Sequence, residues 1–368
     1  MEIETEVSQK KLSMRKYLIG PIIFINIYAF FLPSIILPQY GFQAFQKRIF
    51  PNHTFASGEQ TLCNTNTSTE QFHNQQTVTT ETATWNLYNS LASCLPAVIT
   101  NFIFGSYSDQ YGRKLFLALS TSGSFLKIGL CCVGAYLGWG IYYFILFYAF
   151  DGITGMWICF ITISYSYVAD ITRKGKSRTF AIVLVELCVG LAAVSASITS
   201  GYFVRNFGFV LPLATCAGLL LIQMILLVCF LPETVQKRKN KKQISITEQA
   251  KRVFRFYLKD NPASGGYRWK FIVCILIFIL VSHSVLGRGV ETLYQLNTPF
   301  CWSSVFIGWY TTITTVVQNV VGMAIAKILQ NYLSELSIAI IAMLSFTSGF
   351  LLEGFASNDI ELFLGKQV

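Results

Sequence analysis

Residues 105–114 read G-S-Y-S-D-Q-Y-G-R-K, a short charged turn between two long apolar stretches at 85–105 and 114–136. Each stretch holds about 20 residues, the length that a helix needs to cross the ~30 Å hydrocarbon core of a bilayer. Within the turn, glycine allows a tight reversal at Gly112, and Asp109 can accept hydrogen bonds at a helix start, where the helix dipole favours a negative charge. Two spans joined in this way predict a polytopic α-helical membrane protein.

The rest of the chain has the same character. Hydrophobic residues make up 53% of the 368 residues and charged residues 12%, whereas a soluble domain carries about 25% charged residues. Inside a bilayer each span satisfies its own backbone hydrogen bonds as a helix. The sequence predicts an all-α protein with nine spans, at 17–37, 85–105, 114–136, 140–168, 178–203, 209–231, 270–295, 303–328 and 334–355.

The basic residues predict the orientation. With the N-terminus in the cytosol, 22 of the 28 lysines and arginines lie in cytosolic segments, as the positive-inside rule requires. The domains follow: a cytosolic N-terminus at 1–16, a six-helix bundle at 17–231, a basic central loop at 232–269 and a three-helix part at 270–368. The net charge of +10 therefore reflects topology and attraction to acidic lipid, with no nucleic-acid partner expected.

The outer loop at 38–84 is rich in Thr, Asn, Gln and Ser and holds two glycosylation sequons, at Asn52 and Asn66. Eight of the ten cysteines fall inside predicted spans, where cysteine is usually a small apolar residue. Only Cys63 and Cys301 lie outside, on a face where oxidising conditions favour pairing. The sequence favours a disulfide between them, with two free thiols as the alternative.

The turn at 105–114 resembles the signature loop of the major facilitator superfamily, G-x-x-x-D-R-x-G-R-[RK]. Five positions match, and the first basic position is Gln110 instead. The matching residues are Gly105, Asp109, Gly112, Arg113 and Lys114. Two further segments resemble the same superfamily: Asp170 and Arg178 bracket the loop after the fourth span, and residues 232–234, P-E-T, end the sixth. The resemblance implies a transporter whose two halves rock around a central site.

A narrower resemblance rests on residues 293–302 (LYQLNTPFCW), 307–310 (IGWY), 178–180 (RTF) and 184–190 (LVELCVG). Together these are similar to solute carrier family 46, over nearly the whole chain. That resemblance implies proton-driven symport of a small organic anion, with Glu186 at the functional glutamate position of span five, and it supports the Cys63–Cys301 bridge.

One departure from the superfamily concerns the number of spans. The superfamily fold has two six-helix halves, whereas this sequence predicts six spans plus three and the start of a tenth. The sequence therefore predicts an incomplete C-terminal half. The main hypothesis is a secondary active transporter, and the alternative is a truncated, non-transporting form or subunit that binds or regulates a full-length relative.

Ionisable residues at bilayer depth are costly and mark functional sites. Asp151 and Lys127 lie at similar depths in spans four and three. For Asp151 a cavity group and a structural ion pair with Lys127 are both open. Glu186, among apolar neighbours in span five, is the candidate proton carrier, and its alternative is a hydrogen-bonded contact between helices.

Span seven carries His283, Arg288 and Glu291. Arg288 and Glu291 are three residues apart and share a helical face, so Arg288 is the candidate ligand for a substrate anion and Glu291 its holder between turnovers. A structural pair at the outer end is the alternative. His283 can titrate in an acidic medium or make a plain interhelical hydrogen bond.

Other activities lack a motif. The sequence shows no phosphate-binding loop, no metal-ligand cluster and no nucleophile triad, so we expect neither an enzyme nor a cofactor beyond the proton gradient. The expected partners are a small organic anion, protons and membrane lipid, and a homo-oligomer is compatible with the sequence. The expected location is the plasma membrane, with the lysosomal membrane as the alternative.

Overall fold

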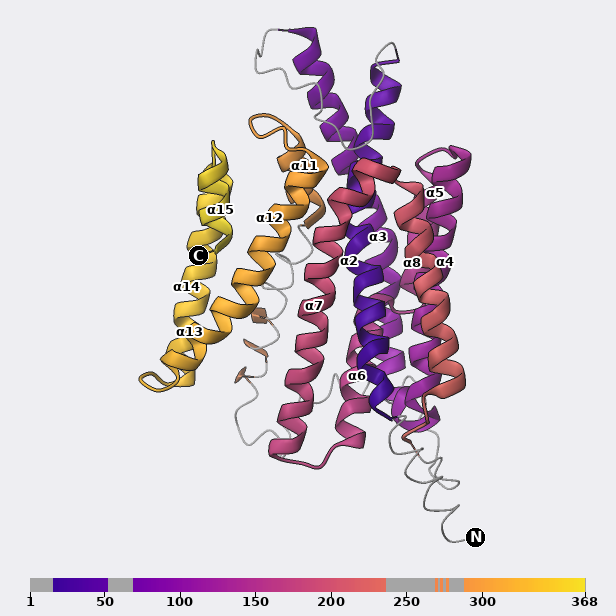
Figure 1. Ribbon diagram of the computed structural model, residues 1–368, viewed down its shortest axis with the longest axis vertical. Coiled ribbons are helices and arrows are strands. Elements are labelled where there is room, and N and C mark those ends of the chain that lie inside the picture. The colour runs from indigo at the N-terminus through magenta and orange to yellow at the C-terminus, as the bar shows by residue number, and fades with distance from the viewer. Residues whose placement is uncertain are drawn as a thin grey trace.

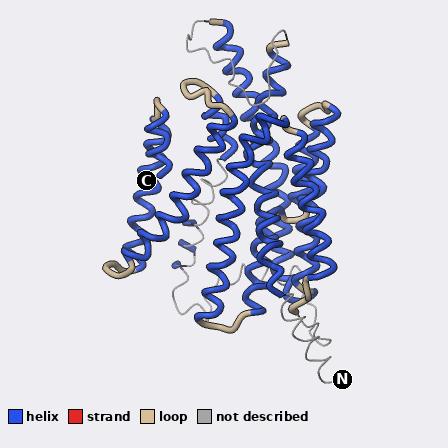
Figure 2. Tube along the Cα trace, in the orientation of Figure 1, coloured by secondary structure: helices blue, strands red, loops and turns tan. Residues whose placement is uncertain are grey.

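The computed structural model describes residues 16–51, 69–235, 269–270, 272–273, 276–277 and 288–367. Throughout this part of the chain every regular element is a helix (Figures 1 and 2). The main helices are α2 (Ile19–Ile49), α3 (Glu70–Tyr111), α4 (Arg113–Leu137), α5 (Tyr143–Ile153), α6 (Met156–Ile171), α7 (Lys176–Phe207), α8 (Val210–Ile225), α11 (Arg288–Leu296), α12 (Ser304–Val316), α13 (Gly322–Leu329), α14 (Glu335–Phe355) and α15 (Asp359–Gln367). The all-helical prediction is confirmed.

Seven helical stretches in the described residues are long and apolar enough to cross a membrane. Six of them match the first six predicted spans, and the seventh matches the span predicted at 334–355. The predicted span at 303–328 is helical throughout, from Ser304 to Leu329, with a π-helical segment η4 at Val317–Val321 between α12 and α13. Most of the predicted span at 270–295 lies outside the described residues, so the division into six plus three stays a prediction.

The segment at 38–84, expected as a loop, is largely helical where the structure describes it, at 38–51 and 69–84. Helix α2 continues to Ile49, and α3 already begins at Glu70, so both project beyond the rest of the bundle at the top of Figure 1. Threonines in the first turns of α3 return their hydroxyls to the carbonyl four residues earlier, as Thr82 does to Val78 at 2.7 Å. These internal bonds, and the burial of Trp85 against Gly41 of α2, let helix persist where composition suggests loop. Asn52, Cys63 and Asn66 lie outside the described residues.

The fourth predicted span is divided into α5 and α6. The break falls at Gly155, whose φ of +91° favours glycine, and its carbonyl accepts a hydrogen bond from Asn101 Nδ2 at 3.0 Å. One turn earlier, the position of a Cβ at Gly152 is occupied by the backbone of Ser93 in α3. Glycine therefore lets α3 and α5 touch, rather than opening space beside Asp151.

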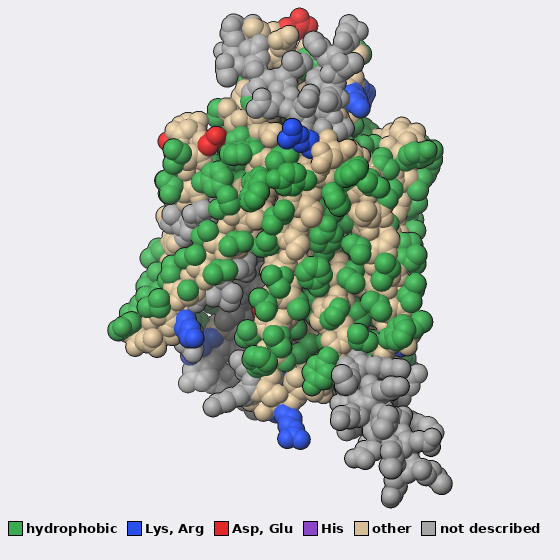
Figure 3. All heavy atoms as spheres, in the orientation of Figure 1, with side chains coloured by type: hydrophobic (Ala, Val, Ile, Leu, Met, Phe, Trp, Pro, Cys, Tyr) green, Lys and Arg blue, Asp and Glu red, His purple; other side chains and the backbone are tan. Residues whose placement is uncertain are grey.

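The two parts of the chain meet where α12 crosses α7. A Cβ on Gly201 of α7 would fall 2.6 Å from the carbonyl oxygen of Ser304, and a Cβ on Gly308 of α12 would fall 2.9 Å from the carbonyl oxygen of Ser197. Small residues thus bring two backbones into contact, the usual basis of helix association in lipid. On the face shown in Figure 3, the described surface is mainly apolar along its middle, with charged side chains mainly near the two ends.

At the end where α11 and α12 meet, aromatic side chains join these helices to α15. Trp302 donates its Nε1–H to Asp359 Oδ1 at 2.8 Å, and its ring packs against Tyr310 and Phe363. Cys301, beside it, is disulfide-bonded. Because its partner lies outside the described residues, the pairing with Cys63 stays a prediction.

Candidate transport site

The signature turn is the centre of a polar network at one end of the bundle. Arg113, only 12% exposed, donates from Nε to Asp170 Oδ2 at 3.2 Å, pairs with Asp109, and donates from Nη1 to Ser108 Oγ at 2.7 Å. Thr234 adds a bond to the same Asp170 oxygen at 3.3 Å. The turns that follow spans two, four and six therefore meet at one end, as the predicted topology requires.

Glu233 provides the negative charge at the start of α4. Its carboxylate accepts the backbone N–H groups of Arg113 at 2.9 Å and Lys114 at 3.1 Å, which lie in the first turn of the helix and have no intrahelical partner. Gly112, with φ of +113°, passes so close that a Cβ there would overlap the carboxylate. Glycine is therefore favoured at position 112 by the positive φ and by the Glu233 carboxylate beside it.

One expectation for this network needs correction. Asp109, expected at a helix start, lies in the last turn of α3 and acts through its pair with Arg113. Asp170 binds Arg113 rather than forming a pair with Arg178, which donates to the carbonyls of Ala169 and Thr172. At Gly105, a Cβ would meet no described atom within 4 Å.

Lys127 and Asp151 form a buried ion pair between α4 and α5. Lys127 Nζ lies 2.5 Å from Asp151 Oδ2, Ser124 Oγ donates to Oδ1 at 2.8 Å, and the ammonium lies 5.2 Å from the centre of the Tyr148 ring. Asp151 is 1% exposed. A carboxylate with both oxygens engaged and no solvent contact is typical of a structural pair, which favours that alternative over a substrate group.

Glu186 of α7 accepts a hydrogen bond from the hydroxyl of Tyr165 on α6. The sequence places it among apolar neighbours, yet its side chain is exposed, next to the buried Val185. Ten residues separate it from the start of α7, which is about 15 Å along the helix and roughly a third of its 32 residues. Glu186 thus lies within a predicted span and has an exposed side chain. Its partner Tyr165 was not predicted from the sequence.

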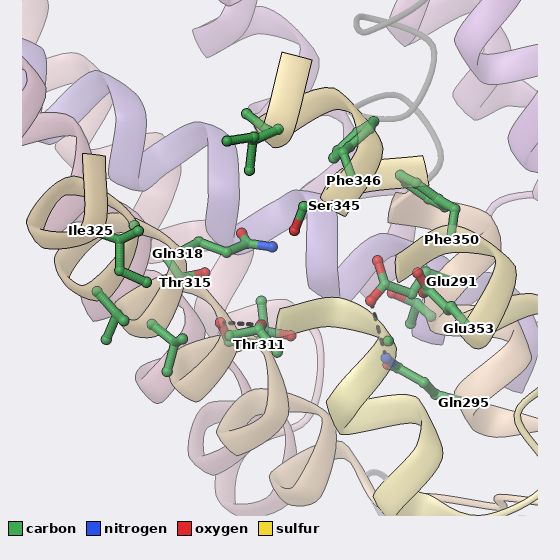
Figure 4. A pocket seen from close by; sticks show the side chains of 18 of the residues that line it. Glu291, Gln295, Thr311, Thr315, Gln318, Ile325, Ser345, Phe346, Phe350 and Glu353 are labelled. Carbon is green, nitrogen blue, oxygen red and sulfur yellow. Dashed lines mark hydrogen bonds between the residues drawn. The ribbon is translucent and has the colours of Figure 1, made fainter. Parts of the chain in front are cut away.

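A cavity of about 490 Å³ lies between α2, α11, the α12–α13 helix and α14, within the usual size range of small-molecule sites. Polar and apolar side chains both line it (Figure 4). The polar ones come mainly from α12 and η4, through Thr311, Thr314, Thr315 and Gln318, and the apolar ones include Ile325, Ile338, Phe346 and Phe350. Gln318 belongs to the π-helical segment, a feature that is frequent at functional sites.

Two carboxylates, Glu291 of α11 and Glu353 of α14, lie at the same end of this cavity (Figure 4). Gln295 is 2% exposed, and its Nε2 donates a hydrogen bond to Glu291 Oε1 at 3.5 Å. Glu353 was missed by the sequence analysis, although an acid inside an otherwise apolar span is a usable signal. Arg288 begins α11, but its side chain and all of His283 lie outside the described residues.

Comparison with known proteins places this architecture in a family. The sequence model of the Major Facilitator Superfamily matches residues 19–365, so the chain belongs to that superfamily. In three dimensions it is similar to the human organic anion transporter MFSD10 (TETRAN), with a TM-score of 0.60, 16% identity, and coverage of 96% of this chain and 82% of that one. At that identity the likeness concerns the fold alone.

Curated relatives narrow the comparison to solute carrier family 46. The chain is 26% identical over 356 residues to the chicken (Gallus gallus) lysosomal proton-coupled steroid conjugate and bile acid symporter SLC46A3, covering 95% of this chain and 76% of that protein. The human counterpart is 26% identical, with 96% and 77% covered. The rat (Rattus norvegicus) proton-coupled folate transporter is 25% identical, with 78% and 62% covered. The resemblance drawn from the motifs is confirmed.

Proposed function

We propose that this integral, multi-pass membrane protein is a secondary active transporter that couples proton entry to symport of a small organic anion by alternating access. The observation that carries the proposal is Glu186, an exposed acid inside a membrane-spanning helix whose carboxylate accepts a hydrogen bond from Tyr165. Ionisable groups at this depth mark ion pathways. The named activities of the relatives, proton-coupled transport of steroid conjugates, bile acids or folate, support the same mechanism.

The cavity gives an electrostatic reason for coupling. Its described lining contains two carboxylates, Glu291 and Glu353, and no Lys or Arg. An organic anion is repelled by ionised carboxylates in a low-dielectric site, so protonation of these groups favours its binding. Its lining combines hydroxyl groups with aromatic and aliphatic side chains and so suits an amphipathic solute. Arg288, the proposed anion ligand, and His283 keep their roles as predictions.

The test is uptake by cells that express the chain, at acidic and neutral outside pH, with radiolabelled folate, taurocholate and a steroid sulfate as probes. We expect acid-stimulated uptake of at least one probe, and its loss in Glu186→Gln at unchanged surface abundance. Retained acid stimulation in that variant would refute the proton role of Glu186. No uptake of any probe by protein that is confirmed in the membrane would favour the alternative, a non-transporting regulatory subunit, which no described feature otherwise favours.

The membrane of residence is a second point for experiment. From the sequence we expect the plasma membrane, but the word "lysosomal" in the names of the SLC46A3 relatives supports the lysosomal membrane. Imaging a tagged chain against a lysosomal marker and a surface marker separates the two. If the chain is lysosomal, the uptake assay is performed on isolated lysosomes with an acidic lumen.

A further inference from the structure

Tyr165 of α6 makes the polar contact with Glu186 that the structure describes, and neither a motif nor a relative's name assigns it a role. On this basis we infer that Tyr165 is a positioning residue of the proton site: its hydroxyl holds the Glu186 carboxylate between α6 and α7 and sets the acidity at which Glu186 takes up a proton. This inference rests on the proposed role of Glu186 and extends it to a second side chain.

The geometry singles out one donor. Tyr165 lies on α6, Glu186 lies on α7, and the phenol hydroxyl donates across the gap to Glu186 Oε1. A donor to an ionised carboxylate stabilises the charged form relative to the protonated form. Because the phenol bond is stronger to the ionised carboxylate than to the protonated carboxyl, the packing of α6 against α7 depends on whether the proton is bound. Proton loading would thus be felt by two helices at once.

Other titratable or charged groups on α7 and on the helices packed against it engage other atoms. Tyr28 of α2 meets Thr199 Oγ1 at 2.9 Å, Asp170 of α6 binds Arg113, and Arg178 of α7 binds backbone carbonyls. Cys188 of α7 lies near Gly20, Tyr202 of α7 accepts from Trp309 Nε1, and Arg205 lies in the last turn of α7. On the neighbouring helices, Cys159 of α6 lies near Gly155, Tyr40 of α2 packs against Phe144 and Phe209, and Lys47 and Arg48 lie in the last turn of α2. Cys216 of α8 is buried, and the hydroxyl of Tyr310 of α12 lies 3.5 Å from the Leu362 carbonyl. Within the described residues, Tyr165 is therefore the polar contact of Glu186 that the structure assigns.

The same helix offers a matched control. Tyr167, two residues along α6, is buried, and its hydroxyl donates to the Pro232 carbonyl at 2.9 Å. Tyr165→Phe and Tyr167→Phe each remove one phenol hydroxyl and one interhelical hydrogen bond from α6. Only the first removes a donor from a carboxylate that takes up a proton.

The experiment is an infrared pH titration of the purified full chain. The band of the protonated Glu186 carboxyl is isolated by subtracting the spectrum of Glu186→Gln in each background. We expect its midpoint in Tyr165→Phe to rise by about one pH unit, a tenfold gain in proton affinity, while Tyr167→Phe leaves it in place. An unchanged midpoint in Tyr165→Phe, or an equal rise in both variants, would overturn the inference. If Tyr165→Phe cannot be purified, Tyr165→Leu removes the same donor.

Uptake separates this inference from the function on which it rests. If Glu186 carries the coupled proton, the pH of half-maximal uptake rises in Tyr165→Phe together with the infrared midpoint. If the infrared midpoint rises while Glu186→Gln retains acid-stimulated uptake, the positioning role stands and the proton-coupling proposal fails. If Glu186→Gln loses acid-stimulated uptake while the infrared midpoint in Tyr165→Phe does not move, the proton-coupling proposal stands and the positioning role of Tyr165 fails.

Discussion

The N-terminal six-helix bundle and the helices after residue 288 bury their spans to very different degrees. In the bundle, the buried share of the most apolar window runs from 17% in α3 to 56% in α2, whereas in the span of α14 the share is 6%. The charges differ in the same way. Lys127 and Asp151 are enclosed between two helices, while Glu291 and Glu353 line a cavity. The comparison teaches that depth in the membrane does not by itself give an acid a functional role, and that its enclosure must also be known.

The largest effect is expected at the enclosed pair. Asp151→Asn leaves the Lys127 ammonium buried without its counter-charge, and breaking a buried pair on one side costs about 3–5 kcal/mol. We expect a correspondingly large fall in the thermal stability of the purified protein in detergent.

The double variant Lys127→Met/Asp151→Leu sharpens the same point. It replaces two charges by apolar groups of similar size, and such replacements are often neutral or stabilising. Recovery of both stability and uptake is the outcome for a structural pair. If stability recovers while uptake is still lost, Asp151 is again a candidate for binding the substrate or the proton.

The next largest effect on stability is expected at the signature turn, which joins α3 and α4 of the bundle. Gly112→Ala puts a side chain at φ of +113° and against Glu233, and a strained backbone position of this kind costs about 1–3 kcal/mol. Because Glu233 caps α4, we expect the loss to appear in thermal stability of the bundle. Gly105→Ala, where a Cβ meets no described atom, is the control and should change stability by less than about 0.5 kcal/mol. Equal effects of the two would show that the turn tolerates a Cβ next to Glu233.

These regions also differ in how far sequence reasoning could reach. Spans two to six and the meeting of their turns followed from hydropathy and the signature motif, because both are local patterns with a physical cause. The extension of α2 and α3 beyond the membrane did not, since it depends on contacts such as Trp85 with Gly41, which lie far apart in sequence. The similar depths of Lys127 and Asp151 suggested their pairing, but only the structure showed that no room was left for a ligand.

Individual partners were harder to predict than elements. From the sequence we predicted a carboxylate at a helix start in the signature turn and assigned it to Asp109. The structure has such a carboxylate at the start of α4, but it belongs to Glu233, 121 residues from Gly112. Tyr165 escaped notice because a tyrosine in an apolar span has no distinguishing pattern, and its role depends on the rotation of α6 relative to α7. Such assignments need the tertiary arrangement, because one helical face cannot be matched to another from periodicity alone.

The smallest effect on stability is expected at the cavity, and it tests the comparison from the other side. Glu353 is only partly buried and borders a cavity, where solvent screens its interactions. We expect Glu353→Gln to change the unfolding free energy by less than about 1 kcal/mol, against the several kcal/mol expected for Asp151→Asn. Uptake should respond in the opposite order: an amide cannot ionise, so removing one of the two cavity carboxylates should weaken the dependence of anion binding on pH, and the acid stimulation of uptake should fall. Both quantities are measured on one preparation, as thermal stability and as the ratio of uptake at the two pH values. A large loss of stability with an unchanged uptake ratio would make Glu353 a structural group like Asp151, and the distinction between the enclosed and the cavity-lining charges would no longer hold.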